Sequence, residues 1–249
     1  MKPLSEREST ELTMAEVQVY VIHVASAVAR ARHIQAQLDR HGLAAEFVLE
    51  GDVAALTQAD MERWFREPMN QINPGTSCVF KHLMACRRLL ETDRSWALVF
   101  EDDIRLRASF GAVMAKALDE LKQVEPGCLV SLEDSNLRYV PRSQRQPGRT
   151  VYPHFKGRLA GAYLIDRTAA QNLVARATTE KLSEPMDWFH NRCAREGDFK
   201  VYWLHPPVAV QGSLDGSIGS TLDDKPSGWT RIVAFHAERV YKRLLYWFR

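Results

Sequence analysis

Three consecutive carboxylates, Glu101, Asp102 and Asp103, follow directly on the apolar run 96–100. The run is short, aromatic and β-branched, which predicts a buried strand, and open α/β sheets bind ligands beyond the carboxyl ends of such strands. Adjacent carboxylates repel one another and are costly to remove from water unless a cation offsets their charge. Mg²⁺ and Mn²⁺ prefer oxygen ligands, and Mg²⁺ often joins carboxylates to a substrate phosphate. The motif predicts a divalent-cation site, with a solvated acidic turn as the alternative interpretation.

Two further acids have the surroundings expected of a general base. Asp187 lies between apolar neighbours and follows Pro185, a residue that favours the first position of a helix. A partly buried carboxylate there could accept a proton, although an acid at a helix start more often complements the helix dipole. Asp134 stands just after the predicted strand 128–132 and is the competing candidate.

A run of basic residues follows this second strand. It comprises Arg138, Arg142, Arg145, Arg149, Lys156 and Arg158. Guanidinium groups bind carboxylates and phosphates through paired hydrogen bonds, so the segment could hold an anionic acceptor or close over a diphosphate. A solvated, mobile loop is an equally good interpretation, because loops serve both roles.

Cys78, His82 and Cys86 recur at four-residue intervals within the predicted helix 77–90. One face of that helix would present three ligands of the kind that zinc prefers. The same spacing describes a stripe that faces the core, where free cysteines are common. We favour the core stripe, with His82 as a polar residue that lines the site of the acids.

The C-terminal residues 239–249 mix basic and aromatic side chains. The basic ones are Arg239, Lys242, Arg243 and Arg249, and they alternate with tyrosine, tryptophan, phenylalanine and leucine. Such a helix is typical of a peripheral membrane contact. A terminal helix packed on the core is the alternative.

Strands that alternate with helices must position these residues. Strands are predicted at 17–24, 47–49, 96–100, 128–132, 160–165 and 201–204, helices at 30–40, 77–90, 110–124, 168–177, from 185 and at 232–248, and loops at 135–149 and 211–228. This alternation predicts an α/β fold with a mostly parallel central sheet and helices on both faces. We expect a flexible segment over 1–15, a single domain over 16–228 and a terminal helix over 229–249.

The composition is that of an ordinary soluble globular protein, with 45% hydrophobic and 26% charged residues among 249. A formal net charge of +2 argues against a nucleic-acid-binding protein, and no apolar run reaches the length of a membrane span. The N-terminus lacks the basic-then-apolar pattern of a secretory signal. The four cysteines form no CxxC pair, which suits a reducing compartment. We therefore expect a cytoplasmic protein.

Several motifs occur in an order and spacing that resemble one family. They are Tyr20–Val24 with Arg30, Phe47–Gly51, Cys78–Leu83, Ala97–Ile104, Gly161–Ile165, Pro185–Asp187, and Pro206–Gln211 followed by Ser217–Gly219. Together they resemble glycosyltransferase family 25, the lipooligosaccharide biosynthesis transferases, whose relatives include collagen galactosyltransferases. His23 stands where that family usually has Asn, and Ala29 where it has Asp. Ser77 and Lys81 also depart from its pattern, and these differences leave the donor sugar open.

The resemblance implies a GT-A-like fold and a transfer that inverts the anomeric carbon of a UDP-sugar, most simply UDP-galactose. It implies that Mn²⁺ or Mg²⁺ is held by Glu101 and Asp103, and that Asp187, or else Asp134, is the base. The donor site would comprise Ile22, His23, Arg30, His82, Glu101, Asp102, Gln211 and Ser217. The acceptor would be a lipooligosaccharide or another surface glycan or glycolipid, reached by a cytoplasmic protein at the inner face of the bacterial inner membrane.

Two other functions use some of the same features. A nucleotidyltransferase would hold a metal–nucleotide with the same acids, but it should carry a glycine-rich phosphate loop after the first strand, and residues 25–29 contain no glycine. A non-catalytic glycan-binding module would not need the acid cluster at all.

Overall fold

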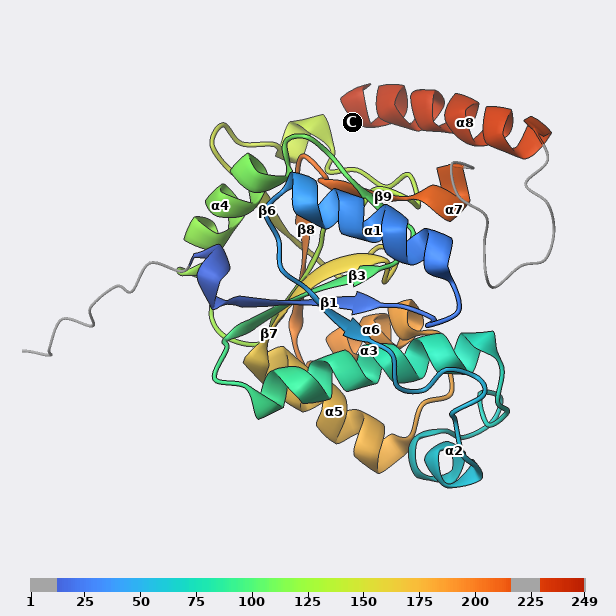
Figure 1. The fold of residues 1–249 in the computed structure, drawn as a ribbon. Helices are drawn as coiled ribbons and strands as arrows, with labels where there is room; N and C mark the ends of the chain where they lie inside the picture. Colours follow the sequence, from blue (N-terminus) through green and yellow to red (C-terminus); the bar gives the residue numbers. More distant parts are fainter. Residues whose placement is uncertain (1–12, 216–228, 249) are drawn as a thin grey trace, which may run out of the picture.

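The computed structural model describes residues 13–215 and 229–248. Its centre is a seven-stranded sheet with strand order β2-β1-β3-β7-β5-β8-β6 (Figure 1). The strands are β1 (Val17–Ile22), β2 (Glu46–Val48), β3 (Trp96–Glu101), β5 (Cys128–Ser131), β6 (Val151–His154), β7 (Ala162–Asp166) and β8 (Lys200–Leu204). A separate pair joins β4 (Ile104–Leu106) to β9 (Ala209–Gln211).

The sheet is mostly parallel, as predicted. β1 runs parallel to β2 and β3, and β5 runs parallel to β8. β7 lies antiparallel between β3 and β5, so those two point the same way, and β6 is antiparallel at the edge. β3 is apolar without alternation because both of its faces are covered, and Leu98, Val99 and Phe100 are all buried.

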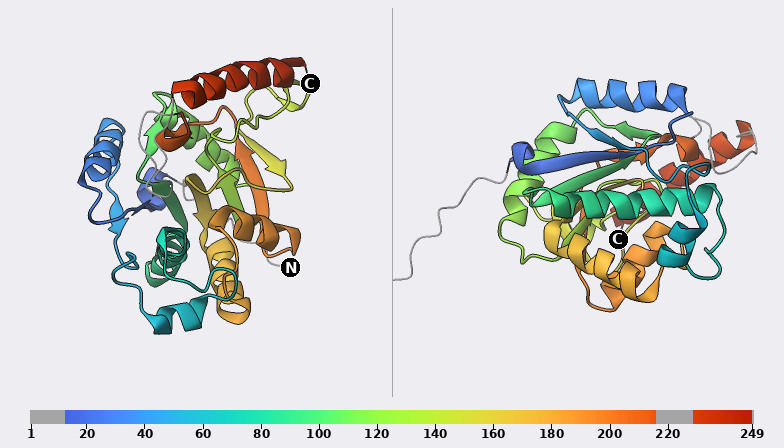
Figure 2. Two further views of the ribbon diagram at one scale, coloured as in Figure 1. Left: turned by 90° about the vertical axis from the view of Figure 1, so that its right-hand side faces the viewer. Right: turned by 60° about the horizontal axis from the view of Figure 1, so that its bottom comes forward.

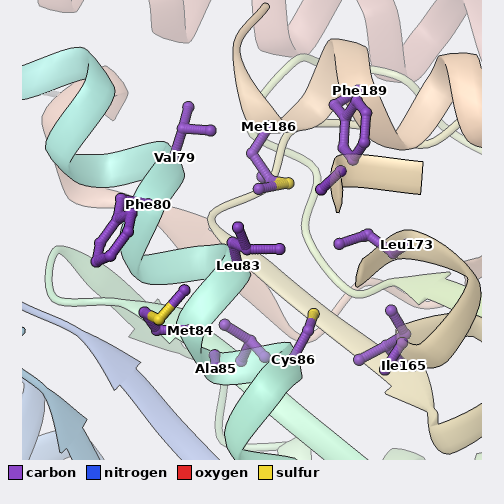
Figure 3. Close-up of a cluster of buried hydrophobic side chains, with 14 of the residues drawn as sticks. Val79, Phe80, Leu83, Met84, Ala85, Cys86, Ile165, Leu173, Met186 and Phe189 are labelled. Atoms are coloured by element: carbon purple, nitrogen blue, oxygen red, sulfur yellow. The ribbon is translucent and has the colours of Figure 1, made fainter. Parts of the chain in front are cut away.

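Helices cover both faces of the sheet (Figure 1). α1 (Val28–Arg40) and α4 (Phe110–Leu121) pack on one face, in the cluster that contains Ile34 and Met114. α2 (Gln58–Trp64), α3 (Pro74–Glu91), α5 (Arg167–Glu180) and α6 (Met186–Arg195) pack on the other. Figure 3 shows part of this second cluster, in which Leu83, Leu173 and Phe189 gather from α3, α5 and α6. The α/β architecture that the sequence predicts, with helices on both faces of a central sheet, is therefore present.

Local sequence signals set the helix that borders the acids. Asn73 caps α3, because its side chain accepts from Thr76 N while the Thr76 hydroxyl accepts from Asn73 N. Pro74 occupies the first helical position, where its missing N–H leaves no bond unmade. These two features fix where α3 starts, and the face of the helix that carries Cys78 and His82 is placed by that start.

Shorter elements depart from the prediction. β4 and β9 have three residues each, too few for periodicity to reveal, and β6 carries Pro153, which only an edge strand tolerates. The predicted loop 211–228 starts instead with the end of β9 and α7 (Gly212–Asp215), and its residues 216–228 lie outside the described residues. Of the predicted segment 1–15, residues 1–12 also lie outside, and Met14 starts the short helix η1 (Met14–Glu16).

The last helix, α8 (Trp229–Phe248), contacts α7 and the short helix η2 (Arg142–Gln144). It lies at the opposite end of the molecule from α2 (Figures 1 and 2). None of the helices that the structure describes combines the length and apolar character needed to cross a bilayer.

Candidate active site

A cavity of about 650 Å³ opens where β1 and β3 end. These strands are parallel and place Ile22 opposite Glu101, so the loops that follow them meet at one edge of the sheet. The cavity is lined by residues 22–27, Arg30, 52–54, Pro74, Ser77, Cys78, Lys81, 101–103 and Ser213. The structure thus brings Ile22, His23 and Arg30 together with the three acids.

The three adjacent acids have different partners. Asp102 is held by the protein, because its carboxylate lies 2.8 Å from His23 Nδ1 and accepts from Arg30 Nη1 at 2.6 Å. Glu101 accepts from Gln211 Nε2 at 3.2 Å. This difference between the partners of Asp102 and Glu101 could not be predicted from the sequence, because the partners come from distant elements.

Asp103 is the acid with an unused oxygen. Its Oδ2 accepts from Ser213 N at 3.2 Å, whereas its buried Oδ1 has no hydrogen-bond partner among the described residues. Burial, reinforced by the charge of Glu101, raises the pKa of Asp103 to about 6. A divalent cation would offset both effects, and the carboxylate oxygens of Glu101 and Asp103 are of the ligand type that Mn²⁺ and Mg²⁺ prefer.

A further acid lies close behind this cluster. Glu133 is fully buried, and its Oε1 accepts from Ala162 N at 3.2 Å. Burial raises the pKa of Glu133 to about 8, and Glu101 and Asp103 add to that rise. Glu133 is therefore protonated at neutral pH and adds no charge to the site.

His82 lies beside the acids. Its Nδ1 is 3.1 Å from the Tyr163 hydroxyl, and its Nε2 is 3.5 Å from Glu101 Oε1. Ligand atoms of Cys78, His82 and Glu101 all lie within 4.8 Å of one another. Cys86 is buried and is not part of this group. The set that the helix spacing suggested, with two cysteines, is therefore not assembled.

Lys81 is a site residue that the sequence analysis noted only as a departure from the family pattern. Its side chain is buried, and Nζ lies 2.7 Å from Asp52 Oδ1 and donates to Leu49 O at 2.9 Å. Ser77 Oγ donates to Gly51 O at 2.6 Å in the same loop. Together these bonds hold the loop after β2 against the cavity. A lysine within the predicted helix 77–90, next to His82, is the signal that could have indicated it.

Gln211 and Ser217 complete the predicted donor residues. Gln211 is the last residue of β9, and its side chain packs on Gly161, where an added Cβ would lie 2.4 Å from Gln211 Nε2. Gly161 is therefore required for the contact between Gln211 and Glu101. Ser217 lies outside the described residues.

The two candidate bases differ in their surroundings. Asp187 lies in the first turn of α6, and burial raises its pKa, with Glu101 adding to the rise and His82 opposing it. Asp187 is thus within electrostatic reach of the acid cluster. Asp134 is fully buried, and both its oxygens accept from Arg107 Nη2 at 2.7 Å and from Arg239 Nη2 at 3.2 Å. Two guanidinium groups occupy Asp134, so the geometry favours Asp187 as the base.

Five of the six basic residues in and after this loop fall into two groups. Arg138, Lys156 and Arg158 line a cavity of about 420 Å³ together with Asp187. Arg145 Nε donates to Val140 O and Arg149 Nε to Val151 O, so these two support the loop itself.

The helix α8 is docked on the body and also exposes apolar side chains. Arg239 pairs with Asp134, and the rings of Tyr246 and Tyr139 meet at 5.6 Å. Val240, Tyr241 and Leu244 are more than half exposed. The helix is thus packed on the body, and a membrane contact of its exposed face stays a prediction.

Residues 16–190 match the model of glycosyltransferase family 25, described as an LPS biosynthesis protein. No curated protein matches the sequence. Among solved structures, A197 from STIV is similar at 12% identity over 76% of this chain and 81% of that one, with a TM-score of 0.41. A glycosyltransferase involved in the glycosylation of the major capsid of PBCV-1 is similar at 8% identity over 89% and 98%, with a TM-score of 0.37.

Proposed function

The chain belongs to glycosyltransferase family 25, and we propose that it moves galactose from UDP-galactose to a lipooligosaccharide or a related surface glycan, with inversion at the anomeric carbon. Family membership favours this over the nucleotidyltransferase and glycan-binding interpretations of the same acids.

On the donor side, the cavity at the ends of β1 and β3 would hold the nucleotide diphosphate. Glu101 and Asp103 would hold Mn²⁺ or Mg²⁺, which when bound supplies positive charge to the diphosphate leaving group. Asp102 keeps Arg30 and His23 at the cavity wall through its 2.6 Å and 2.8 Å contacts. Arg30 thereby keeps a cationic side chain at the edge of the donor cavity.

On the acceptor side, Asp187 would take the proton of the acceptor hydroxyl. The hydroxyl oxygen forms a bond to the anomeric carbon as the bond from that carbon to the UDP oxygen breaks. The proton goes to the Asp187 carboxylate and UDP leaves, so charge and atoms balance. A carboxylate whose pKa is raised by burial is a stronger base than an ordinary aspartate, which suits this role.

We place this activity on the cytoplasmic side of the bacterial inner membrane. The support is the outward face of α8, where Val240, Tyr241 and Leu244 are exposed beside Lys242. Apolar side chains next to basic ones suit an anionic lipid surface.

The observation that carries the proposal is the buried, unpartnered Oδ1 of Asp103 beside Glu101 in the cavity between β1 and β3. A thermal-shift panel of nucleotide sugars, with and without Mn²⁺, tests it, because a ligand that binds only the folded state raises the melting temperature by mass action. We expect UDP-galactose to stabilise the protein more with Mn²⁺ than without. A panel in which no nucleotide sugar stabilises the protein under either condition would overturn the proposal.

A further inference from the structure

The cavity of about 420 Å³ beside Asp187 has more cations than acids on its walls. Arg192 and Glu184 offset each other there, because they form an ion pair that Glu180 extends. Arg138, Lys156 and Arg158 remain as cations deeper in the wall, with Arg195 at the exposed rim. The proposed base, Asp187, is the acid left to face them.

Arg138 and Lys156 are half-buried, and neither forms an ion pair with a carboxylate in residues 13–215 and 229–248. Partly desolvated cations without a counter-ion are unfavourable unless a ligand supplies the negative charge. Arg158 adds to the positive potential. It is 2% exposed, its Nη1 donates to Glu133 O at 2.7 Å, and its Nε and Nη2 have no hydrogen-bond partner among the described residues.

The same two cations also border a neighbouring cavity. This second cavity, of about 690 Å³, shares Arg138 and Lys156 with the first and has aromatic walls at Tyr139, Phe155 and Trp203. On the other side, Trp188 follows Asp187 in α6 and is 64% exposed. An exposed indole offers a flat apolar face with a polar edge, and a sugar ring can pack on such a face. Arg138 and Lys156 therefore lie between Trp188, which is next to the proposed base, and the aromatic side chains of the second cavity.

We propose that the cavity beside Asp187 binds the acceptor glycan through an anionic substituent, either a phosphate or a carboxylate. Arg138 and Lys156 would bind this substituent through ion pairs. Trp188 packs on the sugar that offers its hydroxyl to Asp187. The inference rests on the proposed glycosyl transfer and adds the class of acceptor: a saccharide that carries an oxyanion close to the residue to be extended. Guanidinium and ammonium groups bind both kinds of oxyanion, so the two substituents are separate arms of the test.

The test compares glucose, glucose 6-phosphate and glucuronate as ligands of the full chain, by ligand-observed NMR titration. We expect at least one of the charged sugars to bind about tenfold more tightly than glucose, and the difference to shrink in high salt, where exposed charges are screened. Tighter binding of glucose 6-phosphate would indicate a phosphate as the substituent, and tighter binding of glucuronate would indicate a carboxylate. Equal affinity for all three sugars would overturn the proposal, as would no binding of either charged sugar.

Matched variants locate the site. Arg138→Gln/Lys156→Gln should reduce the charged sugars to the affinity of glucose, whereas Arg40→Gln/Arg66→Gln, which removes two exposed charges elsewhere, should keep the preference. If the double variant does not fold, the single variant Lys156→Gln replaces it. We expect this variant to lose part of the preference for charged sugars. Trp188→Ala should weaken all saccharides that bind, charged or not. A preference that survives in Arg138→Gln/Lys156→Gln would show that other residues bind the anion.

The binding of UDP with Mn²⁺, measured on the same variants, separates this inference from the proposed function. We expect it to be unchanged in Arg138→Gln/Lys156→Gln, because both residues lie outside the donor cavity. A loss of UDP binding in that variant would assign the two cations to the donor diphosphate and overturn the inference. A wild-type protein that binds no nucleotide sugar but prefers charged sugars would contradict the glycosyl transfer and leave the anion site standing.

Discussion

Arg30 Nη1 donates to Asp102 Oδ1 at 2.6 Å, so the middle carboxylate of the acid cluster is neutralised by the protein itself. His23 adds a second contact at 2.8 Å. Glu101 and Asp103 on either side have no arginine or lysine in ion-pair contact among the described residues. The cluster therefore consists of one acid that is paired within the protein and two that we propose as cation ligands.

Asp103→Asn should abolish transfer and weaken the Mn²⁺-dependent binding of UDP by at least about tenfold, because the variant loses a charged oxygen ligand. The melting temperature should not fall, since Asn removes a buried charge while keeping the shape. Calorimetry with UDP and Mn²⁺ measures the effect, and Asp93→Asn, an exposed acid away from the cavity, is the control. Wild-type turnover in Asp103→Asn, with or without a chelator, would contradict the assignment.

Asp103 also sets an expected pH dependence. Its pKa of about 6 is above the ordinary value of 3.8, so the carboxyl is protonated below about pH 6 and must lose a proton before it can hold a cation. The Mn²⁺-dependent affinity for UDP should therefore fall as the pH drops from about 7 to about 5, by up to about tenfold per pH unit for one proton. Binding of UDP in EDTA serves as the reference. An affinity with Mn²⁺ that is constant across this range would show that Asp103 is not a ligand.

Parts of this site follow from local sequence and parts do not. The acids at the end of β3 and the start of α6 at Pro185–Asp187 are visible because a strand run, a charge cluster and a helix-start proline are all local patterns. The different hydrogen-bond partners of the acids include Gln211 and Ser213, which lie in β9 and α7, more than a hundred residues away in the sequence. Strand direction is equally hidden, because a buried run such as β7 has the same pattern in either orientation.

Asp187→Asn should lower turnover by roughly 10²-fold or more, because Asn keeps the shape but cannot accept the proton. Binding of UDP with Mn²⁺ should change little, since Asp187 lines the cavity that holds Arg138 and not the proposed donor cavity. A residue that merely complements the helix dipole would instead lose up to about 1 kcal/mol of stability and no activity. Full turnover in Asp187→Asn would therefore remove it from the mechanism.

Asp134→Asn is the matched comparison. Its carboxylate pairs with Arg107 and Arg239, so the change should lower the free energy of unfolding by up to about 3 kcal/mol, limited because both arginines are partly exposed. The folded fraction should keep most of its turnover per molecule. An Asp134→Asn protein that is as stable as wild type but inactive would make Asp134 the base.

Glu133 predicts a loss of stability at alkaline pH. Its pKa of about 8 in the folded protein lies above its ordinary value of 4.5, so the folded state holds the proton more tightly than the unfolded chain. This stabilisation is complete below about pH 4.5 and is lost progressively as the pH rises to about 8. Glu133→Gln should therefore unfold at a higher temperature than wild type at about pH 8, with the gain shrinking or reversing near pH 5. Melting curves across this range, in the absence of divalent cations, measure it; a constant difference between the two proteins would refute it.

The exposed face of α8 gives the test of membrane contact. Truncation after Glu238 removes the apolar residues but also Arg239, whose pairing with Asp134 holds the helix to the body. Tyr241→Ser/Leu244→Gln is the sharper change, because both side chains are more than half exposed and Arg239 stays in place. This variant should bind anionic vesicles about tenfold more weakly, since apolar burial and basic charge act together at a lipid surface. Its melting temperature and its turnover on a soluble acceptor should match wild type.

Arg239→Gln is the complementary variant, and we expect it to lower stability while the apolar face remains. If Tyr241→Ser/Leu244→Gln co-sediments with vesicles as well as wild type does, this face of α8 does not contact the membrane.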